Sequence, residues 1–199
     1  MTEPVQLKQE NLHRLADEIA RPSYDRSKVK AGIVHIGVGG FHRSHEAYYT
    51  DALMNDSDAS DWGICGVGLR DADRKIGDIL KAQDHLYTLI VKHPQGTVET
   101  CVIGSLVDFM LGCDDPGAVI DRIASADTRI VSLTITEGGY NFNPATGEFD
   151  FGNSDVRHDL EHPSSPKTVF GYLTAALKKR RAQGLPAVTI QSCDNIQHN

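Results

Sequence analysis

The sequence is poor in cysteine, has no long apolar run and carries no excess of positive charge. Its four cysteines form no C-x-x-C pair, which argues against a zinc site or a disulfide framework, and we expect three of them to be small buried residues in a reducing compartment. No apolar stretch reaches the roughly 20 residues of a transmembrane helix. A net charge of −7 and a pI of about 5.7 argue against nucleic acid or an anionic membrane as a partner. The first residues lack the basic and apolar regions of a signal peptide, so we expect a cytoplasmic protein.

A glycine-rich turn follows the first buried strand that the sequence predicts. The apolar run 33–36 leads into Gly37-x-Gly39 and then into a polar segment with helical character. A strand, a tight turn and a helix N-terminus form the unit that binds the pyrophosphate of a dinucleotide. Gly37 permits the turn, and Gly39 lets the backbone approach the phosphates. His42 stands where the third glycine of G-x-G-x-x-G is expected, so an ordinary strand-to-helix turn remains an alternative.

An acidic residue follows the second predicted strand, the apolar run 62–69. An acid at this place in a dinucleotide-binding unit contacts the adenosine ribose, and Asp71 is the better placed candidate, with Asp73 second. A carboxylate there repels a 2′-phosphate, which favours NAD over NADP, although the neighbouring Arg70 weakens that inference. Asp71 is equally suited to cap the helix predicted at 76–80.

A second glycine-containing loop follows the strand predicted at 129–135. It contains Gly138 and Gly139, and loops at the carboxyl ends of parallel strands form the ligand crevice of a doubly wound sheet. We therefore expect this loop to approach a cofactor, with a flexible turn as the alternative.

The remaining pattern alternates strands and helices. It predicts an α/β protein with a doubly wound, mostly parallel sheet of the Rossmann type and a β-hairpin embellishment. We expect an amino-terminal helix and linker over 1–29, containing Leu12, Leu15 and Ile19, and a dinucleotide-binding domain over 30–199. The other elements are predicted as a hairpin at 87–91 and 98–103, a strand at 106–111 that joins either sheet, a helix from Asp115-Pro116, an irregular segment at 141–166, a helix at 168–182 and a strand at 187–192.

Two histidine patterns raise the question of a metal site. His158-x-x-Glu161-His162 matches an inverted zinc-protease motif, and His42 and His45 are three residues apart. Prolines crowd the first pattern, and neither has an obvious third ligand downstream. We interpret these histidines as surface residues and predict no metal site.

Taken together, several segments resemble the polyol-specific long-chain dehydrogenases, particularly those that oxidise mannitol at C2. The resemblance covers nearly the whole chain, and the Gly-x-Gly-x-Phe-x-Arg loop of that family also accounts for His42 in place of a glycine. The segments that carry it are 37–45, 64–69, 82–84, 86–89, 131–140 and 192–195.

The resemblance implies a metal-independent enzyme that interconverts D-mannitol and D-fructose with NAD(H). It assigns Asn195 to an oxyanion hole. It places the general acid/base lysine, a second asparagine and a histidine in a carboxyl-terminal helical domain that this chain lacks and that the substrate site needs. We expect the chain alone to bind NAD(H) weakly without turnover and to expose an apolar patch. The residues expected to bind the cofactor are Gly37, Val38, Gly39, Gly40, Phe41, Arg43, Asp71, Thr136, Glu137 and Gly138.

Two other functions remain open at this point. A sister enzyme acting on arabinitol or a hexuronate shares the loop and the fold, because substrate choice lies mostly in the absent domain. A non-catalytic NAD-binding module that regulates or scaffolds a partner is the alternative of a different class.

Overall fold

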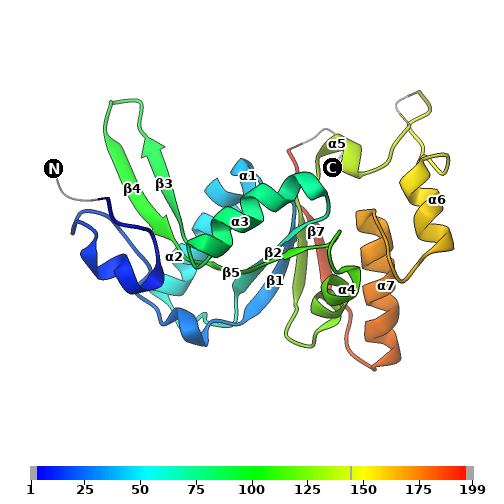
Figure 1. Cartoon of the computed structure of the whole chain (residues 1–199), viewed down its shortest axis with the longest axis horizontal. Helices are drawn as coiled ribbons and strands as arrows, with labels where there is room; N and C mark the ends of the chain where they lie inside the picture. Colours follow the sequence, from blue (N-terminus) through cyan, green and yellow to red (C-terminus); the bar gives the residue numbers. More distant parts are fainter. Residues whose placement is uncertain (1–3, 144, 196–199) are drawn as a thin grey trace.

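The computed structural model describes residues 4–143 and 145–195 and contains two sheets (Figure 1). The larger sheet has five parallel strands in the order β5-β2-β1-β6-β7. This confirms the predicted doubly wound, mostly parallel α/β fold. The five strands are β1 (Ala31–Ile36), β2 (Gly63–Gly68), β5 (Leu106–Leu111), β6 (Ile130–Leu133) and β7 (Thr189–Ser192).

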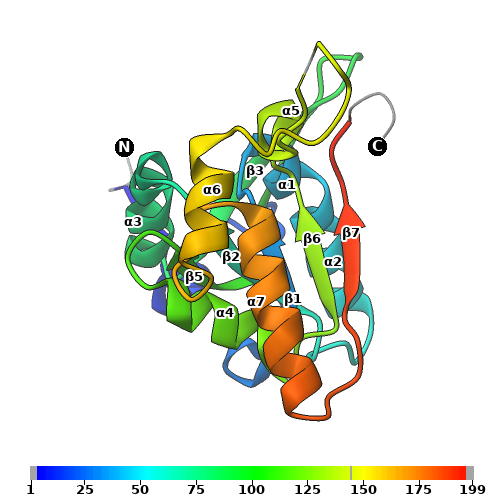
Figure 2. The ribbon, with the colours of Figure 1, turned by 90° about the vertical axis from the view of Figure 1, so that its right-hand side faces the viewer.

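The central strands are short apolar runs because helices cover both faces of the sheet. Every residue of β1 and β2 is buried. Val34 and Ile36 pack on one side against α4 (Pro116–Ala124) and α7 (Val169–Ala182). Ile33 packs on the opposite side, where α2 (Glu46–Asp56) and α3 (Arg74–Ala82) lie. Figure 2 shows α4 and α7 in front of the sheet and α2 behind it.

The edge strand β7 differs from the others because all four of its residues are exposed. It pairs with β6 on one side, in register from Ile130↔Thr189 to Leu133↔Ser192. The helices that precede β6 and β7 in the chain, α4 and α7, begin as the sequence predicts. Asp115 caps α4 by accepting a hydrogen bond from Ala118 N, and Thr168 caps α7 by accepting one from Gly171 N.

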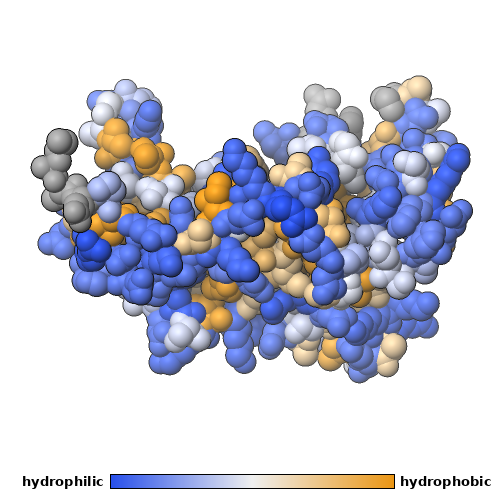
Figure 3. Space-filling view, in the orientation of Figure 1, coloured by the Kyte–Doolittle hydropathy of each residue, from blue (hydrophilic) through white to orange (hydrophobic). Residues whose placement is uncertain are grey.

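The predicted hairpin is a separate two-stranded antiparallel sheet, β3 (Tyr87–Lys92) and β4 (Val98–Ile103). The segment 106–111, which the sequence left between two sheets, joins the parallel one. Ile90 and Val98 are more than half exposed on the hairpin, where Figure 3 shows a group of apolar atoms at the upper left.

The amino-terminal segment differs from the predicted helix through Ile19. It forms only two short 3₁₀ helices, η1 (Gln9–Arg14) and η2 (Arg26–Lys28). Leu12 packs with Leu86 and Val102 next to the hairpin. These tertiary contacts fix an extended path where helical periodicity alone predicted a longer helix.

Three further segments differ locally from the sequence prediction. The helix after the glycine turn is broken at His45 into α1 (Gly40–Ser44) and α2. The loop 141–166 contains a regular helix, α6 (Ser154–Glu161), which Asn153 caps. Cys65 is buried, but Cys101 and Cys193 are only partly buried and Cys113 is exposed. Across the described ranges, no helix is long and apolar enough to cross a membrane.

Candidate functional site

A crevice of about 270 Å³ lies at the carboxyl ends of β1 and β6. The chain turns to opposite sides of the sheet from these two neighbouring strands, and in such sheets ligands bind at this switch point. Its walls come from the turn after β1, the loop after β6 and the start of α7. The lining residues are Ile36, Gly37, Leu69, Arg70, Asp73, Thr134, Ile135, Thr136, Gly138, Gly139, Asn141, Asp155, Lys167, Thr168 and Val169.

Gly37 is the one position of the turn where the backbone requires glycine. Its φ is +101°, and an added Cβ would lie 2.1 Å from the carbonyl oxygen of Thr134. The close approach is fixed by two hydrogen bonds. Gly37 N donates to Val67 O at 3.0 Å, and the Thr134 hydroxyl donates to Gly37 O at 2.6 Å.

Three other glycines of the two loops face open space, whereas Gly139 packs against Ile135, where an added Cβ would lie 2.6 Å from Ile135 Cβ. A Cβ on Gly40 or Gly138 would meet no heavy atom within 4 Å, and one on Gly39 would meet only Gly37 O at 3.9 Å. Space that a side chain would fill, next to exposed backbone, fits the close approach of a bound phosphate or ribose. Of these three glycines only Gly138 lines the crevice, and the predicted approach of the loops to a cofactor stays a prediction.

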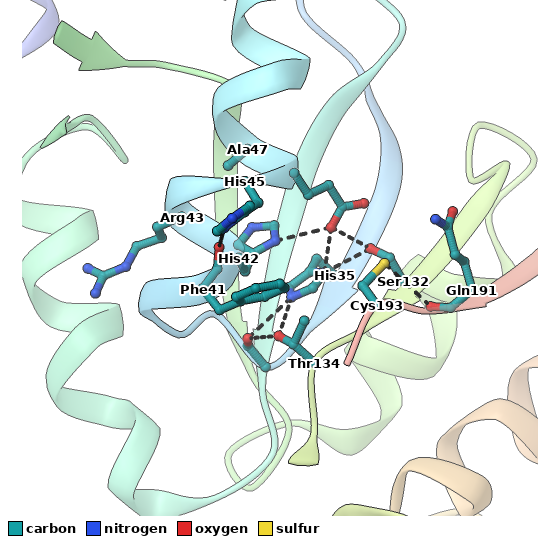
Figure 4. A network of polar contacts seen from close by, with 12 residues as sticks. His35, Phe41, His42, Arg43, His45, Ala47, Ser132, Thr134, Gln191 and Cys193 are labelled. Atoms are coloured by element: carbon teal, nitrogen blue, oxygen red, sulfur yellow. Dashed lines mark hydrogen bonds and ion pairs between the residues drawn. The ribbon is translucent and has the colours of Figure 1, made fainter. Parts of the chain in front are cut away.

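The side chains of the first loop point in different directions. Val38 is buried against Gly66, where it supports the turn from below. Phe41 is 47% exposed and stacks on His45 with ring centroids 4.3 Å apart. The Arg43 guanidinium donates to Gly39 O at 3.2 Å and points away from the centre of the site in Figure 4. Phe41 and Arg43 are thus available at the surface, whereas Val38 is structural.

Asp71 lies beside the crevice and is not one of its lining residues. Its side chain is 85% exposed and accepts hydrogen bonds from the Arg74 guanidinium at 3.0 and 3.1 Å, which in turn pairs with Asp114. Asp71 makes no capping hydrogen bond to α3. Asp73, whose carboxylate accepts from Arg70 N at 3.0 Å, fixes the turn that precedes α3. The capping alternative for Asp71 was wrong, and its carboxylate is presented to solvent.

The loop after β6 forms a single short turn, α5 (Thr136–Gly139). Thr136, Glu137 and Gly138 are exposed, as expected for residues that approach a ligand. Thr136 adopts a φ of +59°, which is rare for a β-branched residue. Asn195 is also exposed and follows β7, the neighbour of β6.

Sequence reasoning missed a buried polar network beneath the crevice. Glu46 Oε2 lies 2.8 Å from His35 Nδ1, 3.1 Å from His42 Nδ1 and 3.0 Å from the Ser132 hydroxyl. The opposite nitrogen of His35 lies 2.9 Å from Thr134 Oγ1, which donates to Gly37 O. The network therefore joins α2, β1 and β6 to the glycine turn. Strand alternation, which sets His35 on the α2 face, was the one available signal.

The protonation of Glu46 follows from its partners. Burial acts to raise the pKa of Glu46, but the hydrogen bonds from His35 and His42 outweigh it and hold this pKa well below its ordinary value of 4.5.

The geometry of this network does not suit a metal ion. His35, His42 and Glu46 are the one group of potential ligands that lies close enough together in the described part of the chain. The two rings are stacked, with centroids 3.5 Å apart and planes at 15° (Figure 4). An ion bound by Nδ1 of both would lie outside the plane of each ring, whereas imidazole donates its lone pair within the plane. The second histidine pair, His158 and His162, is also stacked.

His42 is buried, so its interpretation as a surface residue was wrong. Burial lowers the pKa of His42 from 6.5 to about 4. Its Nδ1 contacts Glu46, and its Nε2 has no hydrogen-bond partner, so a proton on Nε2 would be a buried donor without an acceptor.

This pKa predicts a pH-dependent stability. Between pH 4 and pH 6.5 the unfolded chain binds a proton at His42 that the folded chain does not, so stability falls as the pH decreases through this window. The slope is expected to reach about 1.4 kcal/mol per pH unit. The variant His42→Asn keeps a donor near Glu46 but does not titrate. Urea unfolding at several pH values between 7.5 and 4.5 should show that the free energy of unfolding changes less with pH in the variant than in the wild type. If the free energies of both proteins change equally with pH, this assignment is refuted.

A larger cavity, of about 790 Å³, lies between the amino-terminal segment, α2 and β4. Glu18, Asp51, Asp56 and Glu99 line it together with apolar side chains. It contains neither glycine loop and lies away from the carboxyl ends of the sheet. The buried carboxylate of Asp51 already accepts hydrogen bonds there from the Tyr24 hydroxyl, Gly104 N and the Asn55 amide. We therefore take the smaller crevice as the candidate functional site.

A family model described as the mannitol dehydrogenase Rossmann domain matches residues 31–199. The chain belongs to the mannitol dehydrogenase family. A solved member, the Pseudomonas fluorescens mannitol 2-dehydrogenase in a ternary complex with NAD and D-mannitol, superposes with a TM-score of 0.94 at 54% identity, covering 98% of this chain and 40% of that one. A D-sorbitol dehydrogenase structure in substrate-free form superposes with a TM-score of 0.91 at 45% identity, covering 97% of this chain and 40% of that one.

Curated members of the mannitol dehydrogenase family match over the same region. A mannitol 2-dehydrogenase of Pyricularia oryzae is 50% identical, covering 89% of this chain and 36% of that protein. A polyol:NADP oxidoreductase of Gluconobacter oxydans is 47% identical, covering 96% of this chain and 39% of that protein. The chain thus spans about two fifths of the length of these relatives.

Proposed function

We propose that this chain is the NAD(H)-binding part of a polyol dehydrogenase that interconverts D-mannitol and D-fructose, with residues 30–199 as its cofactor domain. The observation that carries the proposal is the crevice between two glycine loops at the switch point of the sheet. It is supported by the near-complete superposition on a relative whose complex contains NAD and D-mannitol.

The residues around the crevice fit a dinucleotide in distinct ways. Gly37 shapes the turn, and Gly39, Gly40 and Gly138 leave room for the pyrophosphate and ribose next to the backbone. Phe41 and Arg43 border the first loop, Val38 supports it from the core, and Thr136 and Glu137 border the second. When bound, NAD supplies hydride-transfer chemistry at its nicotinamide ring.

Asn195 is proposed to contribute to the reaction by orienting its side-chain amide toward the reacting oxygen of the sugar. An amide N–H stabilises the negative charge that develops there in the transition state. The general acid/base is proposed to lie in a carboxyl-terminal domain outside this chain.

The first test is titration of NADH into the purified chain, followed by fluorescence, and then an assay of NADH oxidation with D-fructose at high protein concentration. We expect binding without turnover. Clear turnover would show that an acid/base within these residues suffices and would overturn its assignment to another domain. A chain that folds but binds no NADH would overturn the proposal itself.

A related polyol specificity is the second candidate, because the chain is also 45% identical to a D-sorbitol dehydrogenase and 47% identical to a polyol:NADP oxidoreductase. Comparing the turnover of mannitol, sorbitol, arabinitol and fructuronate by the protein extended at its carboxyl end to the length of its relatives separates these specificities. A highest kcat/KM for a substrate other than mannitol would replace the mannitol proposal.

Asp71 is proposed to favour NAD over NADP. Its exposed carboxylate, held by Arg74, would repel a 2′-phosphate. The variant Asp71→Asn should therefore lower the ratio of NADH to NADPH affinity by about tenfold, a modest factor because the site is exposed to solvent. Asp78→Asn, which removes the same charge from an exposed position on α3, serves as the control. If Asp71→Asn and Asp78→Asn lower the ratio of NADH to NADPH affinity equally, net charge rather than Asp71 determines the preference for NAD.

A further inference from the structure

Asp194 connects the two loops that end neighbouring strands of the sheet. It follows β7, and its carboxylate accepts hydrogen bonds from two successive backbone amides after β6, Ile135 N at 2.9 Å and Thr136 N at 3.0 Å. Each amide contacts a different oxygen of the carboxylate. The contact is therefore bidentate and fixes the direction of the peptide between Ile135 and Thr136.

The amides that Asp194 holds belong to a strained turn. Thr136 has a φ of +59°, a left-handed conformation that β-branched residues rarely adopt. Asn141, just beyond the turn, has a φ of +53°. Such conformations persist when surrounding contacts determine them, and the carboxylate of Asp194 is a contact made directly to Thr136.

The carboxylate itself is held in place from two sides. The Tyr140 hydroxyl donates to Asp194 Oδ2 at 2.8 Å and also contacts the Ser192 hydroxyl. Burial raises the pKa of Tyr140, so its phenol keeps the proton that it donates. Cys193 N donates to Leu133 O at 2.8 Å, which continues the β6–β7 ladder to the residue before Asp194. The position of Asp194 is thus determined by the sheet and by Tyr140.

We propose that Asp194 is a positioning residue that fixes the strained turn at Thr136 and the neighbouring Asn195 at the same time. Asp194 is half-buried against the turn, whereas Asn195, one residue further on, is exposed. The Asp194 carboxylate is therefore the direct link between the turn at Thr136 and the residue that precedes Asn195. This inference rests on the proposed roles of Asn195 and of the loop after β6.

A double-mutant cycle tests the inference. Asp194→Asn keeps the shape of the side chain and removes its charge and one acceptor oxygen. It should increase the Kd for NADH about tenfold and increase amide hydrogen exchange at Ile135 and Thr136 by a similar factor. In a Thr136→Gly background both effects should be at least halved, because glycine adopts a positive φ without penalty and needs no carboxylate to hold it. A merely structural role for Asp194 predicts the same losses in both backgrounds, and that result would overturn the proposal.

Two controls keep the cycle interpretable. Asp127→Asn removes a charge from an exposed position before the amino-terminal end of β6, away from the loops at its carboxyl end, and should leave the Kd for NADH and the amide exchange rates unchanged. If circular dichroism shows that Asp194→Asn does not fold, Tyr140→Phe removes the phenol's contacts with Asp194 and Ser192, keeps the Asp194 carboxylate, and should produce a smaller change of the same sign. No change in Tyr140→Phe would then count against the proposal.

Kinetics of the protein extended to the length of its relatives separate this inference from the proposed function. Asp194→Asn should lower kcat by about tenfold, more than it changes the KM for the polyol. If Asn195→Ala leaves kcat unchanged, the oxyanion role of Asn195 fails, while the cycle on Thr136 still tests the positioning role. If Asn195→Ala lowers kcat but Asp194→Asn changes neither kcat nor exchange, the positioning role alone fails.

Discussion

Replacing Gly37 with alanine is expected to abolish NADH binding and to lower the free energy of unfolding by about 3 kcal/mol or more. The added Cβ would lie 2.1 Å from Thr134 O and 2.9 Å from Thr134 C, both backbone atoms that no rotamer change can move. The φ of +101° adds conformational strain. To accommodate alanine, the ends of β1 and β6 must separate, which breaks the hydrogen bond from Thr134 to Gly37 O and opens the floor of the crevice.

Two alanine variants separate the causes of this effect. Gly96→Ala introduces a side chain at a φ of +86° in the hairpin turn with no atom within 4 Å, so it measures strain without crowding. Gly40→Ala faces open space in the first loop and should retain stability while weakening NADH binding, because its methyl group occupies room proposed for the cofactor. Urea unfolding by circular dichroism and NADH fluorescence give both quantities. If Gly37→Ala is no more destabilising than Gly96→Ala, the contact with Thr134 does not control the turn.

The sheet and the glycine turn were predictable because their determinants are local in sequence. Runs such as 33–36 and 62–69 are apolar over the length of a strand, and Gly37 follows the first of them directly. Asp115 and Thr168 indicate where their helices begin, because each side chain accepts a hydrogen bond from a backbone amide three residues later. The fold class and the place of the crevice therefore follow from short-range patterns.

The determinants of the interior of the site lie far apart in sequence and were not predictable. Asp194 contacts Ile135 across 59 positions, and Ser132 contacts Glu46 across 86. From sequence alone, Glu46 is an ordinary acidic residue in the first turn of a helix, and its contact with Ser132 of β6 forms only in the folded protein. The interpretation of His42 as a surface residue was wrong for the same reason, because its burial depends on stacking against His35 of β1. Local periodicity carries no information about such contacts.

Replacing Glu46 with alanine is expected to produce the second large effect, a loss of about 3–5 kcal/mol in the free energy of unfolding. The carboxylate accepts from His35, His42 and Ser132. Its removal leaves His42 Nδ1 without a partner and leaves His35 Nδ1 and the Ser132 hydroxyl, 2.8 Å apart, with only each other. Because His35 also contacts Thr134 and Gly37 O, the turn above should loosen and NADH affinity should fall together with stability. Urea unfolding at pH 7 measures the loss.

The dependence of this loss on substitution and pH distinguishes the network from a simple cavity. Glu46→Gln retains one acceptor oxygen and nearly the same volume, so it should lower the free energy of unfolding less than Glu46→Ala does. The control Glu148→Ala, at an exposed position, should stay within about 0.5 kcal/mol of the wild type. Since the pKa of Glu46 is held below 4.5, its contribution is complete above pH 4.5 and decreases as the pH falls toward the lower folded-state pKa. The gap between wild type and Glu46→Ala should therefore narrow in acid. A constant gap would mean that lost packing volume, and not the charged hydrogen bonds, accounts for the effect.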